Sequence, residues 1–233
     1  MTKNAFFHQL HRWHIWLGWL VGVPIVMWTL TGLVMTLKPI EEVRGEHLRV
    51  EVEERALPPD TRISIALPAS VEKSAKSITT AMLGDRVVTR IDYLDGTSAR
   101  FGEDGAELPP VTEEEARAIL ARRIVGGNRL SALAAFDADT PPSDLRREIA
   151  VWQATLEDGT HVYVDRASGD IAAVRTPFWR TFDAMWGLHI MDWSGREDSS
   201  HPVLILFAAL SLLGAIMGCV LMFRRRKAGA QRS

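Results

Sequence analysis

Seven histidines and one cysteine are the side chains of this sequence best suited to redox or metal chemistry. The cysteine, Cys219, lies inside an apolar stretch and has no second cysteine to pair with, so we expect neither an intrachain disulfide nor an iron–sulfur cluster. The sequence has no C-x-x-C-H segment, which is the attachment signal of c-type haem. Any haem would therefore be held non-covalently.

Residues suited to hydrolysis are present, but their spacing does not predict an active site. Asp158, His161 and Ser168 lie near one predicted hairpin, where strand alternation gives no reason for a nucleophile to meet its base. Glu113 and Glu114 are typical of a solvated helix start. The sequence has no phosphate-binding glycine loop and no nicotinamide or flavin fingerprint, so a partner would have to supply electrons. Whether the protein is an enzyme stays open.

Two apolar stretches determine where these side chains can lie. Residues 15–37 and 203–223 contain no Asp, Glu, Lys or Arg. At about 1.5 Å of rise per residue, each is long enough to cross a hydrocarbon core of about 30 Å. The first stretch lacks the small-residue cleavage site of a signal peptide, so we expect it to be retained. The pattern predicts two transmembrane helices and excludes a simple soluble enzyme.

The charges predict the orientation of these helices. The segments 1–14 and 224–233 carry seven Lys and Arg and no acid, whereas residues 38–202 carry 20 Lys and Arg and all 29 acids, a net charge of −9. Cationic ends stay in the cytoplasm. We therefore expect a bacterial inner-membrane protein with cytoplasmic termini and a periplasmic middle segment. The acidic middle segment argues against nucleic acid as a partner. The apolar helices are expected to lie in the lipid bilayer.

Tryptophans cluster beside both apolar stretches, where amphipathic rings lie at the lipid headgroups. One such cluster falls in residues 177–202, and Phe178, Phe182, Met185, Trp186 and His189 recur there at helical spacing. We interpret this segment as an interfacial helix and the entry to the second transmembrane helix. An ordinary core helix of the outer domain is the alternative.

The middle segment has the pattern of an α+β domain. Asp95-Gly96 and Asp158-Gly159 each separate two short strands and predict two hairpins, 63 residues apart. This offset suggests a duplicated unit, with residues 38–110 as a divergent first copy and 111–176 as the second, although two hairpins can also resemble each other by chance. A capping box at Thr112 and Glu115 predicts a helix before the second copy, and residues 68–77 are a weaker helix candidate. We expect each helix to lie on an antiparallel sheet.

Residues 162–171, V-Y-V-D-R-A-S-G-D-I, and the helix that begins at Thr112 resemble a PepSY domain. The membrane segments strengthen the resemblance. Residues 11–14 (H-R-W-H), 30–33 (L-T-G-L), 188–189 (L-H) and 224–226 (R-R-R) resemble the helices of PepSY-associated transmembrane proteins. That family includes iron-regulated membrane proteins and ferric-siderophore reductases. The resemblance covers most of the chain.

The resemblance implies a role for three histidines. Some larger relatives, with four or more helices, are taken to bind b-type haem through membrane histidines and to pass electrons to ferric-siderophore complexes. The matching residues in this sequence are His11, His14 and His189. This chain has only two predicted helices, a departure that places an independent transmembrane electron path in doubt.

The predicted topology separates these histidines. His11 and His14 fall near the inner surface and His189 near the outer one, so they cannot bind one iron. His11 and His14 are three residues apart and lie on the same helical face, hence on the same side of a porphyrin. An inner partner would be Met222, Cys219 or a histidine of another protomer. Haem binding therefore predicts a homodimer or a membrane redox partner, whereas histidines without haem would be interfacial anchors.

Two further features concern packing and the remaining histidines. Gly18 with Gly22 and Gly214 with Gly218 form G-x-x-x-G motifs that allow close helix approach, either with each other or in a dimer; they could equally leave room for a macrocycle. His161, like His47, is expected at the surface.

Two functions follow: a haem-binding protein that assists electron transfer or iron acquisition, or a non-enzymatic PepSY module that binds or restrains a periplasmic partner such as a peptidase.

Overall fold

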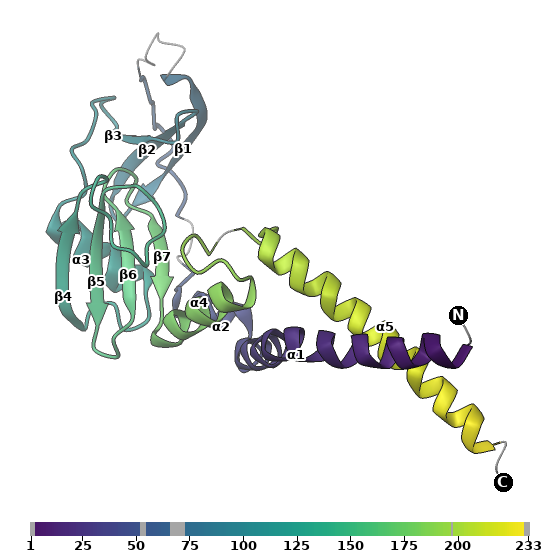
Figure 1. The fold of residues 1–233 in the computed structure, drawn as a ribbon. Helices are drawn as coiled ribbons and strands as arrows, with labels where there is room; N and C mark the ends of the chain where they lie inside the picture. The colour runs from purple at the N-terminus through teal and green to yellow at the C-terminus, as the bar shows by residue number, and fades with distance from the viewer. Residues whose placement is uncertain (1–2, 52–54, 66–72, 197, 231–233) are drawn as a thin grey trace. The chain divides into compact units, whose positions relative to one another are not determined.

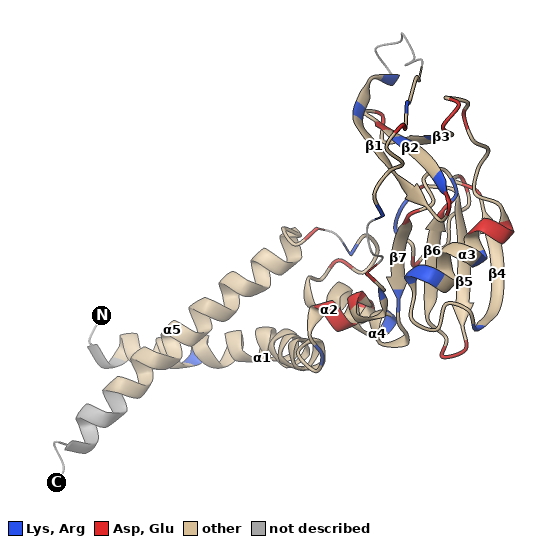
Figure 2. Ribbon diagram, turned by 180° about the vertical axis from the view of Figure 1, so that it is seen from behind, with Lys and Arg blue, Asp and Glu red and all other residues tan. Residues whose placement is uncertain are grey.

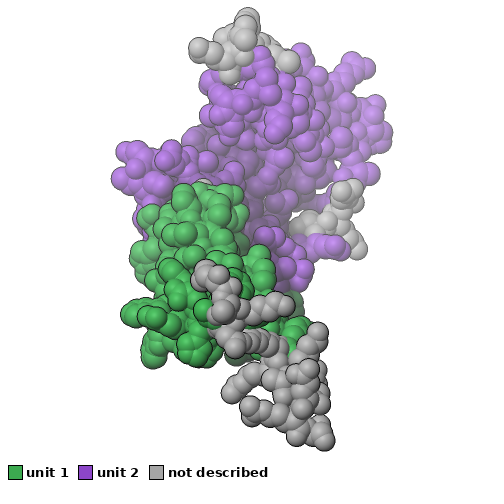
Figure 3. Space-filling model, turned by 45° about the vertical axis from the view of Figure 1, so that its right-hand side comes forward, with its two compact units in different colours: residues 1–39, 181–233 green, residues 40–180 purple. Residues whose placement is uncertain are grey.

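The structure is a computed structural model that describes residues 3–51, 55–65, 73–196 and 198–230. It divides into two compact units. One contains Met1–Pro39 and Thr181–Ser233, and the other contains Ile40–Arg180 (Figure 3).

Two long apolar helices dominate the first unit, α1 (Lys3–Met35) and α5 (Pro202–Ala230). Within them, Ala5–Met35 and Pro202–Phe223 are long and apolar enough to cross a membrane. In Figure 2 both helices are mostly tan, and most of the blue and red lies on the other unit. The predicted segments 1–14 and 15–37 form one helix from residue 3 to residue 35. The shorter helix α4 (Pro177–His189) ends in this unit, and its span agrees with the helix expected within residues 177–202.

The second unit contains two antiparallel sheets (Figure 1). The three-stranded sheet has the order β1-β2-β3, and the four-stranded sheet has the order β4-β5-β6-β7. The strands are β1 (Ala75–Leu83), β2 (Arg86–Tyr93), β3 (Ser98–Phe101), β4 (Leu130–Phe136), β5 (Val151–Leu156), β6 (His161–Asp165) and β7 (Ile171–Arg175). The helical elements are α2 (Ile40–Val43), η1 (Glu46–Leu48) and α3 (Glu113–Arg123). The α+β fold with two flanking apolar helices is therefore as predicted.

The helix α3 covers one face of the four-stranded sheet. Its capping box is complete, because Thr112 Oγ1 accepts from the Glu115 N–H and Glu115 accepts from the Thr112 N–H. Its buried side chains pack against alternate residues of the strands, such as Val162 and Val164. The helix ends before Gly127, where a Cβ would lie 2.0 Å from the Leu120 carbonyl oxygen. Only glycine fits there without a backbone shift.

The two predicted hairpins are present and have the same turn. Asp95 accepts from the backbone and hydroxyl of Thr97, and Asp158 accepts from those of Thr160. The likeness does not extend to the helices. Of the weaker helix candidate, residues 68–72 lie outside the described residues and 75–77 belong to β1, so that prediction is wrong where it can be compared. The pairing with β2 along β1 takes up the backbone groups that a helix would have used internally.

Candidate functional site

His189, the last residue of α4, is held against the second half of α1. Its Nδ1 lies 2.9 Å from Thr31 Oγ1, and its carbonyl oxygen accepts the Trp28 indole N–H at 2.5 Å. A Cβ added to Gly32 would lie 3.4 Å from His189 Cε1, so the ring lies directly over this glycine. Trp28, Thr31 and Gly32 are spaced three and four residues apart and share one helical face. One face of α1 therefore fixes both the backbone and the ring of His189.

The hydrogen bonds of Thr31 favour one tautomer of His189. The Thr31 hydroxyl lies 2.8 Å from the carbonyl oxygen of Met27 and 3.1 Å from that of Trp28, so it can donate its single proton within α1. In that arrangement Thr31 Oγ1 accepts from His189 Nδ1–H, and the lone pair of the neutral ring is on Nε2. Nε2 makes no hydrogen bond within the part of the chain that the structure describes. Metal-ligating histidines have this arrangement, with one ring nitrogen anchored and the other available.

The loop after α4 supports this end of the helix. The Arg196 side chain lies against Gly187, where a Cβ would be 2.9 Å from Arg196 Cγ, and it forms an ion pair with Asp183. The carboxylate of Asp192 is buried and accepts from the Gly195 N–H at 2.9 Å. The chain therefore folds back on α4 through side chains of α4 and of the loop itself. This packing limits the freedom of the helix end that carries His189.

His14 lies in the other half of α1, in contact with α5. A Cβ added to Gly218 would lie 3.0 Å from His14 Cε1, and one added to Gly214 would lie 3.4 Å from Leu17 Cδ2. His14 Nδ1 is buried and has no hydrogen-bond partner within the described residues. His11 is exposed one turn earlier. The helices therefore approach closely where α5 has glycine.

The histidines that the sequence singles out are brought to two separate places. His14 precedes Thr31 by 17 residues, which is about 25 Å along an α-helix. His189 is in contact with Thr31, so neither His11 nor His14 can share an iron with it. The separation deduced from the sequence therefore holds within this unit.

The two G-x-x-x-G motifs do not pack against each other. A Cβ added to Gly18 or Gly22 would have nothing within 4 Å, whereas Gly214 and Gly218 face α1. The expectation that the motifs pair with each other is wrong, because α5 contacts the face of α1 that carries His14 and Leu17. The other alternative, a contact of Gly18 and Gly22 with a second copy of the chain, stays a prediction.

His161 is not the surface residue that the sequence suggested. Its Nδ1 lies 2.9 Å from Asp144 Oδ2, and Tyr163, which is fully buried, donates to the other oxygen of Asp144. Burial alone would raise the pKa of Asp144, but hydrogen bonds from Tyr163 and His161 outweigh it and lower the pKa below 3.8. Burial and the nearby carboxylate raise the pKa of Tyr163. Asp144 belongs to the loop between β4 and β5, so this network fastens that loop to the sheet.

Asp158, His161 and Ser168, which lie near one hairpin, make separate contacts. Asp158 is engaged with Thr160 in the hairpin turn, and Ser168 Oγ accepts from the Asp170 N–H. His161 is engaged with Asp144 instead.

Ligand geometry limits the kind of metal that the described residues could hold. No group of three or more His, Cys, Asp or Glu side chains converges among them. A free cation usually requires such a group, whereas the iron of a haem takes its equatorial ligands from the porphyrin and needs only axial ligands from the protein. A single anchored histidine such as His189 fits the second case.

Sequence reasoning identified His189 but not the residues that orient it. Thr31 and Gly32 stood in the L-T-G-L segment that carries the family resemblance, but no role was inferred for them. Thr31 and His189 are 158 residues apart, and a contact between such distant residues leaves no periodic pattern in the sequence. Only the L-T-G-L segment indicated Thr31 and Gly32.

The combination of two membrane-length helices with antiparallel sheets between them defines the class, a membrane-anchored α+β protein. The family model of the PepSY-associated TM region matches residues 11–233. The chain belongs to this family and is a membrane protein. It matches no curated protein and no solved structure.

Proposed function

We propose that the protein lies in a bacterial inner membrane with both termini in the cytoplasm and residues 38–202 in the periplasm. The seven basic residues of the two ends and the net charge of −9 between them support this orientation through the positive-inside rule. Reporter fusions test it. A cytoplasmic reporter fused at Ala228 should be active, and a periplasmic reporter inserted near Pro110 should be active. The opposite pair of signals would overturn the proposal.

We further propose that His189 is an axial ligand of a b-type haem, and that the protein assists electron transfer or ferric-siderophore acquisition. The observation that carries this proposal is the anchored ring, whose Nδ1 lies 2.9 Å from Thr31 Oγ1, so that Nε2 is the ring nitrogen left for a ligand. When bound, such a haem would supply one-electron redox chemistry. The protein's own contribution is to hold the imidazole in the ligating tautomer, and Gly32 keeps space beside the ring.

A second protein ligand would have to come from elsewhere than His11 or His14, because His14 lies about 25 Å and His11 about 30 Å away along α1. We propose a second copy of the chain or a membrane redox partner as its source. His11 and His14 are the candidates for a separate site in the other half of α1, where the buried and unpartnered Nδ1 of His14 would gain a partner.

The full chain, expressed with ample haem and purified in detergent, tests this function. A Soret band with stoichiometric haem is expected. His189→Ala should remove most of it. Thr31→Val, which keeps the shape but removes the hydrogen-bond acceptor, should lower occupancy, within the 10- to 100-fold loss of affinity typical of outer-shell changes. His47→Ala is the matched control, because His47 is exposed and belongs to the other unit. A colourless wild-type protein, or unchanged occupancy in His189→Ala, would refute the role of His189.

The second candidate function is a non-enzymatic, membrane-anchored module that binds or restrains a periplasmic partner such as a peptidase. One observation favours it: a cleft lined by arginines lies in the otherwise acidic second unit. A colourless protein that still binds a partner through this cleft would support the second function over the first.

A further inference from the structure

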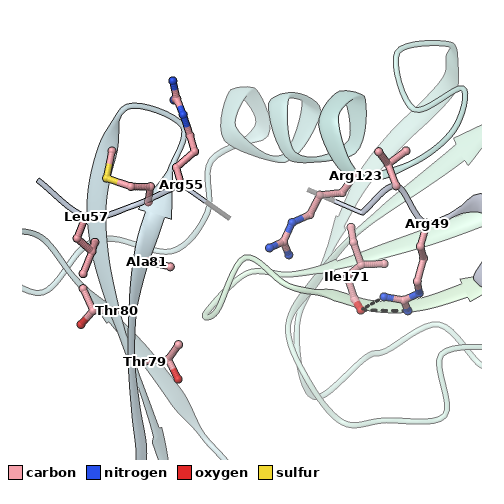
Figure 4. Close-up of a pocket in the computed structure, with 10 residues that line it drawn as sticks. Arg49, Arg55, Leu57, Thr79, Thr80, Ala81, Arg123 and Ile171 are labelled. Atoms are coloured by element: carbon pink, nitrogen blue, oxygen red, sulfur yellow. Dashed lines mark hydrogen bonds between the residues drawn. The ribbon is translucent and has the colours of Figure 1, made fainter. Parts of the chain in front are cut away.

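A cleft of about 510 Å³ opens in the second unit beside the outer edge of β1 (Figure 4). Three arginines line it, Arg49, Arg55 and Arg123, and no Asp or Glu lines it among the residues that the structure describes. Four consecutive residues of β1, 79–82, form the facing wall. The cleft therefore combines a cationic wall with a strand edge.

The backbone places two of the arginines side by side. The Val50 N–H donates to the Arg123 carbonyl oxygen at 2.9 Å, and Arg49 pairs with Ile124 in an antiparallel bridge. The end of α3 and the segment after η1 thus form one wall. Figure 4 shows the Arg123 guanidinium directed into the space toward β1, whereas Arg55 points away from it.

The arginines differ in how their charge is balanced. Arg55 pairs with Asp85 at 3.0 Å, and Arg123 pairs with Asp170 at 3.3 Å. Arg49 donates only to the carbonyl oxygen of Ile171, in two bonds of 3.4 Å, and has no carboxylate partner within the described residues. Long bonds to a neutral carbonyl leave most of the capacity of this guanidinium for a carboxylate. Arg49 is therefore the lining arginine without a carboxylate partner among the described residues, although its guanidinium is turned to the Ile171 carbonyl (Figure 4).

The strand β1 supplies the second half of the site. It lies at one edge of the three-stranded sheet, and among the described strands only β2 pairs with it. An outer strand presents unpaired N–H and C=O groups along its free edge, which another extended chain can pair with. A free anion would use the arginines but would leave this edge unused.

We propose that this cleft binds an extended acidic segment of a partner protein, which pairs with the free edge of β1 and places carboxylates on Arg49 and Arg123. Alternate side chains of a strand face the same side, so the segment would carry an acid at every second position. Arginine binds such carboxylates through two parallel N–H donors. The inference rests on the second candidate function and is independent of haem.

Binding to the detergent-purified full chain is measured by fluorescence polarisation with a labelled peptide of three Glu-Val repeats. Saturable binding that weakens with added salt is expected, and a peptide of three Lys-Val repeats should not bind. Arg49→Gln should weaken binding about tenfold, the loss of one charge-assisted hydrogen-bonded contact, and Arg49→Lys should restore part of it. Arg117→Gln is the matched control, because Arg117 pairs with Glu113 on α3 outside the cleft.

A Glu-Val peptide with alternate amides N-methylated tests the strand pairing. It keeps the charge but cannot donate along the edge, so it should bind at least tenfold more weakly. Equal binding of the methylated peptide, or equal competition by free glutamate at the same carboxylate concentration, would overturn the peptide site in favour of a simple anion site. No saturable binding, or full binding by a folded Arg49→Gln protein, would overturn it as well.

The absorption spectrum of the same samples separates this inference from the haem proposal. Loss of peptide binding with an intact Soret band refutes only the cleft, and a colourless protein that binds the peptide refutes only the haem ligand.

Discussion

Replacement of glycines on the two long helices should have sharply unequal effects. Gly214 and Gly218 lie where α5 contacts α1, whereas Gly18 and Gly22 have open space around them. We therefore predict that Gly218→Ala and Gly218→Ile weaken the α1–α5 contact, that Gly214→Ala has a smaller effect, and that Gly18→Ile and Gly22→Ile leave the contact within one chain unchanged.

The distances give the order of the effects. A Cβ at position 218 would lie 3.0 Å from His14 Cε1, below the roughly 3.5–4.0 Å of an optimal carbon contact. At position 214 the nearest atom, Leu17 Cδ2, would be at 3.4 Å, which is nearly normal. Overpacking of this kind costs about 1–3 kcal/mol, and we place Ala at position 218 near the lower end and the larger Ile near the upper end. Lipid offers little hydrophobic drive for re-association, so the cost falls directly on the helix contact.

Distances between spin labels report the contact. Labels at Val23 and Leu206, both exposed, are introduced into a Cys219→Ser background in lipid nanodiscs. A narrow distance distribution is expected for the parent protein and for the variants at positions 18 and 22, and a broad one for Gly218→Ile. If substitution at Gly18 broadens the distribution while Gly218→Ile does not, the assignment of the contact face is wrong.

Two further predictions concern the second unit, measured by urea unfolding of the full chain in micelles. Asp144→Asn should flatten the acid dependence of stability. Because the folded pKa of Asp144 is lowered, its contribution to stability is present above pH 3.8 and disappears as the pH falls through the lower folded value. The free energy of unfolding should therefore change less between about pH 6 and about pH 3 in the variant, and an unchanged pH dependence would contradict this. Leu145→Ala should cost about 2–5 kcal/mol, because Leu145 belongs to the β4–β5 loop and is fully buried against Val151, Tyr163 and Ala173 of the sheet; a loss below about 1 kcal/mol would show that the loop is not anchored there.

Local sequence signals predicted the elements of the fold well. The capping box at Thr112 and the Asp-Gly turns act over a few residues, so their signatures survive in the sequence. The apolar stretches of α1 and α5 likewise predict two long helices from the local sequence alone. The helix candidate at residues 68–77 is wrong at 75–77, where the chain belongs to β1 and pairs with β2 across the turn at Gly84 and Asp85.

The sites depended on contacts between distant residues and were predicted less completely. His189 stood out as an imidazole beside tryptophans, but its partner Thr31 is 158 residues away. The surface prediction for His161 missed its contact with Asp144, because that carboxylate comes from the loop before β5. Arg49 carries no sequence signal, since the role proposed for it follows from the lack of a carboxylate partner among the described residues.

The lengths of the two apolar spans have a consequence for the bilayer. The uncharged part of α1 from Trp13 to Met35 measures about 35 Å, and the part of α5 from Pro202 to Phe223 about 33 Å, against a hydrocarbon thickness of about 30 Å. Both spans are slightly longer than this thickness, so tilting buries their apolar length, while the packing of α1 against α5 sets the angle at which they cross. Lipid chain length therefore acts on the tilt of α1, and with it on the depth of the α1 face that anchors His189.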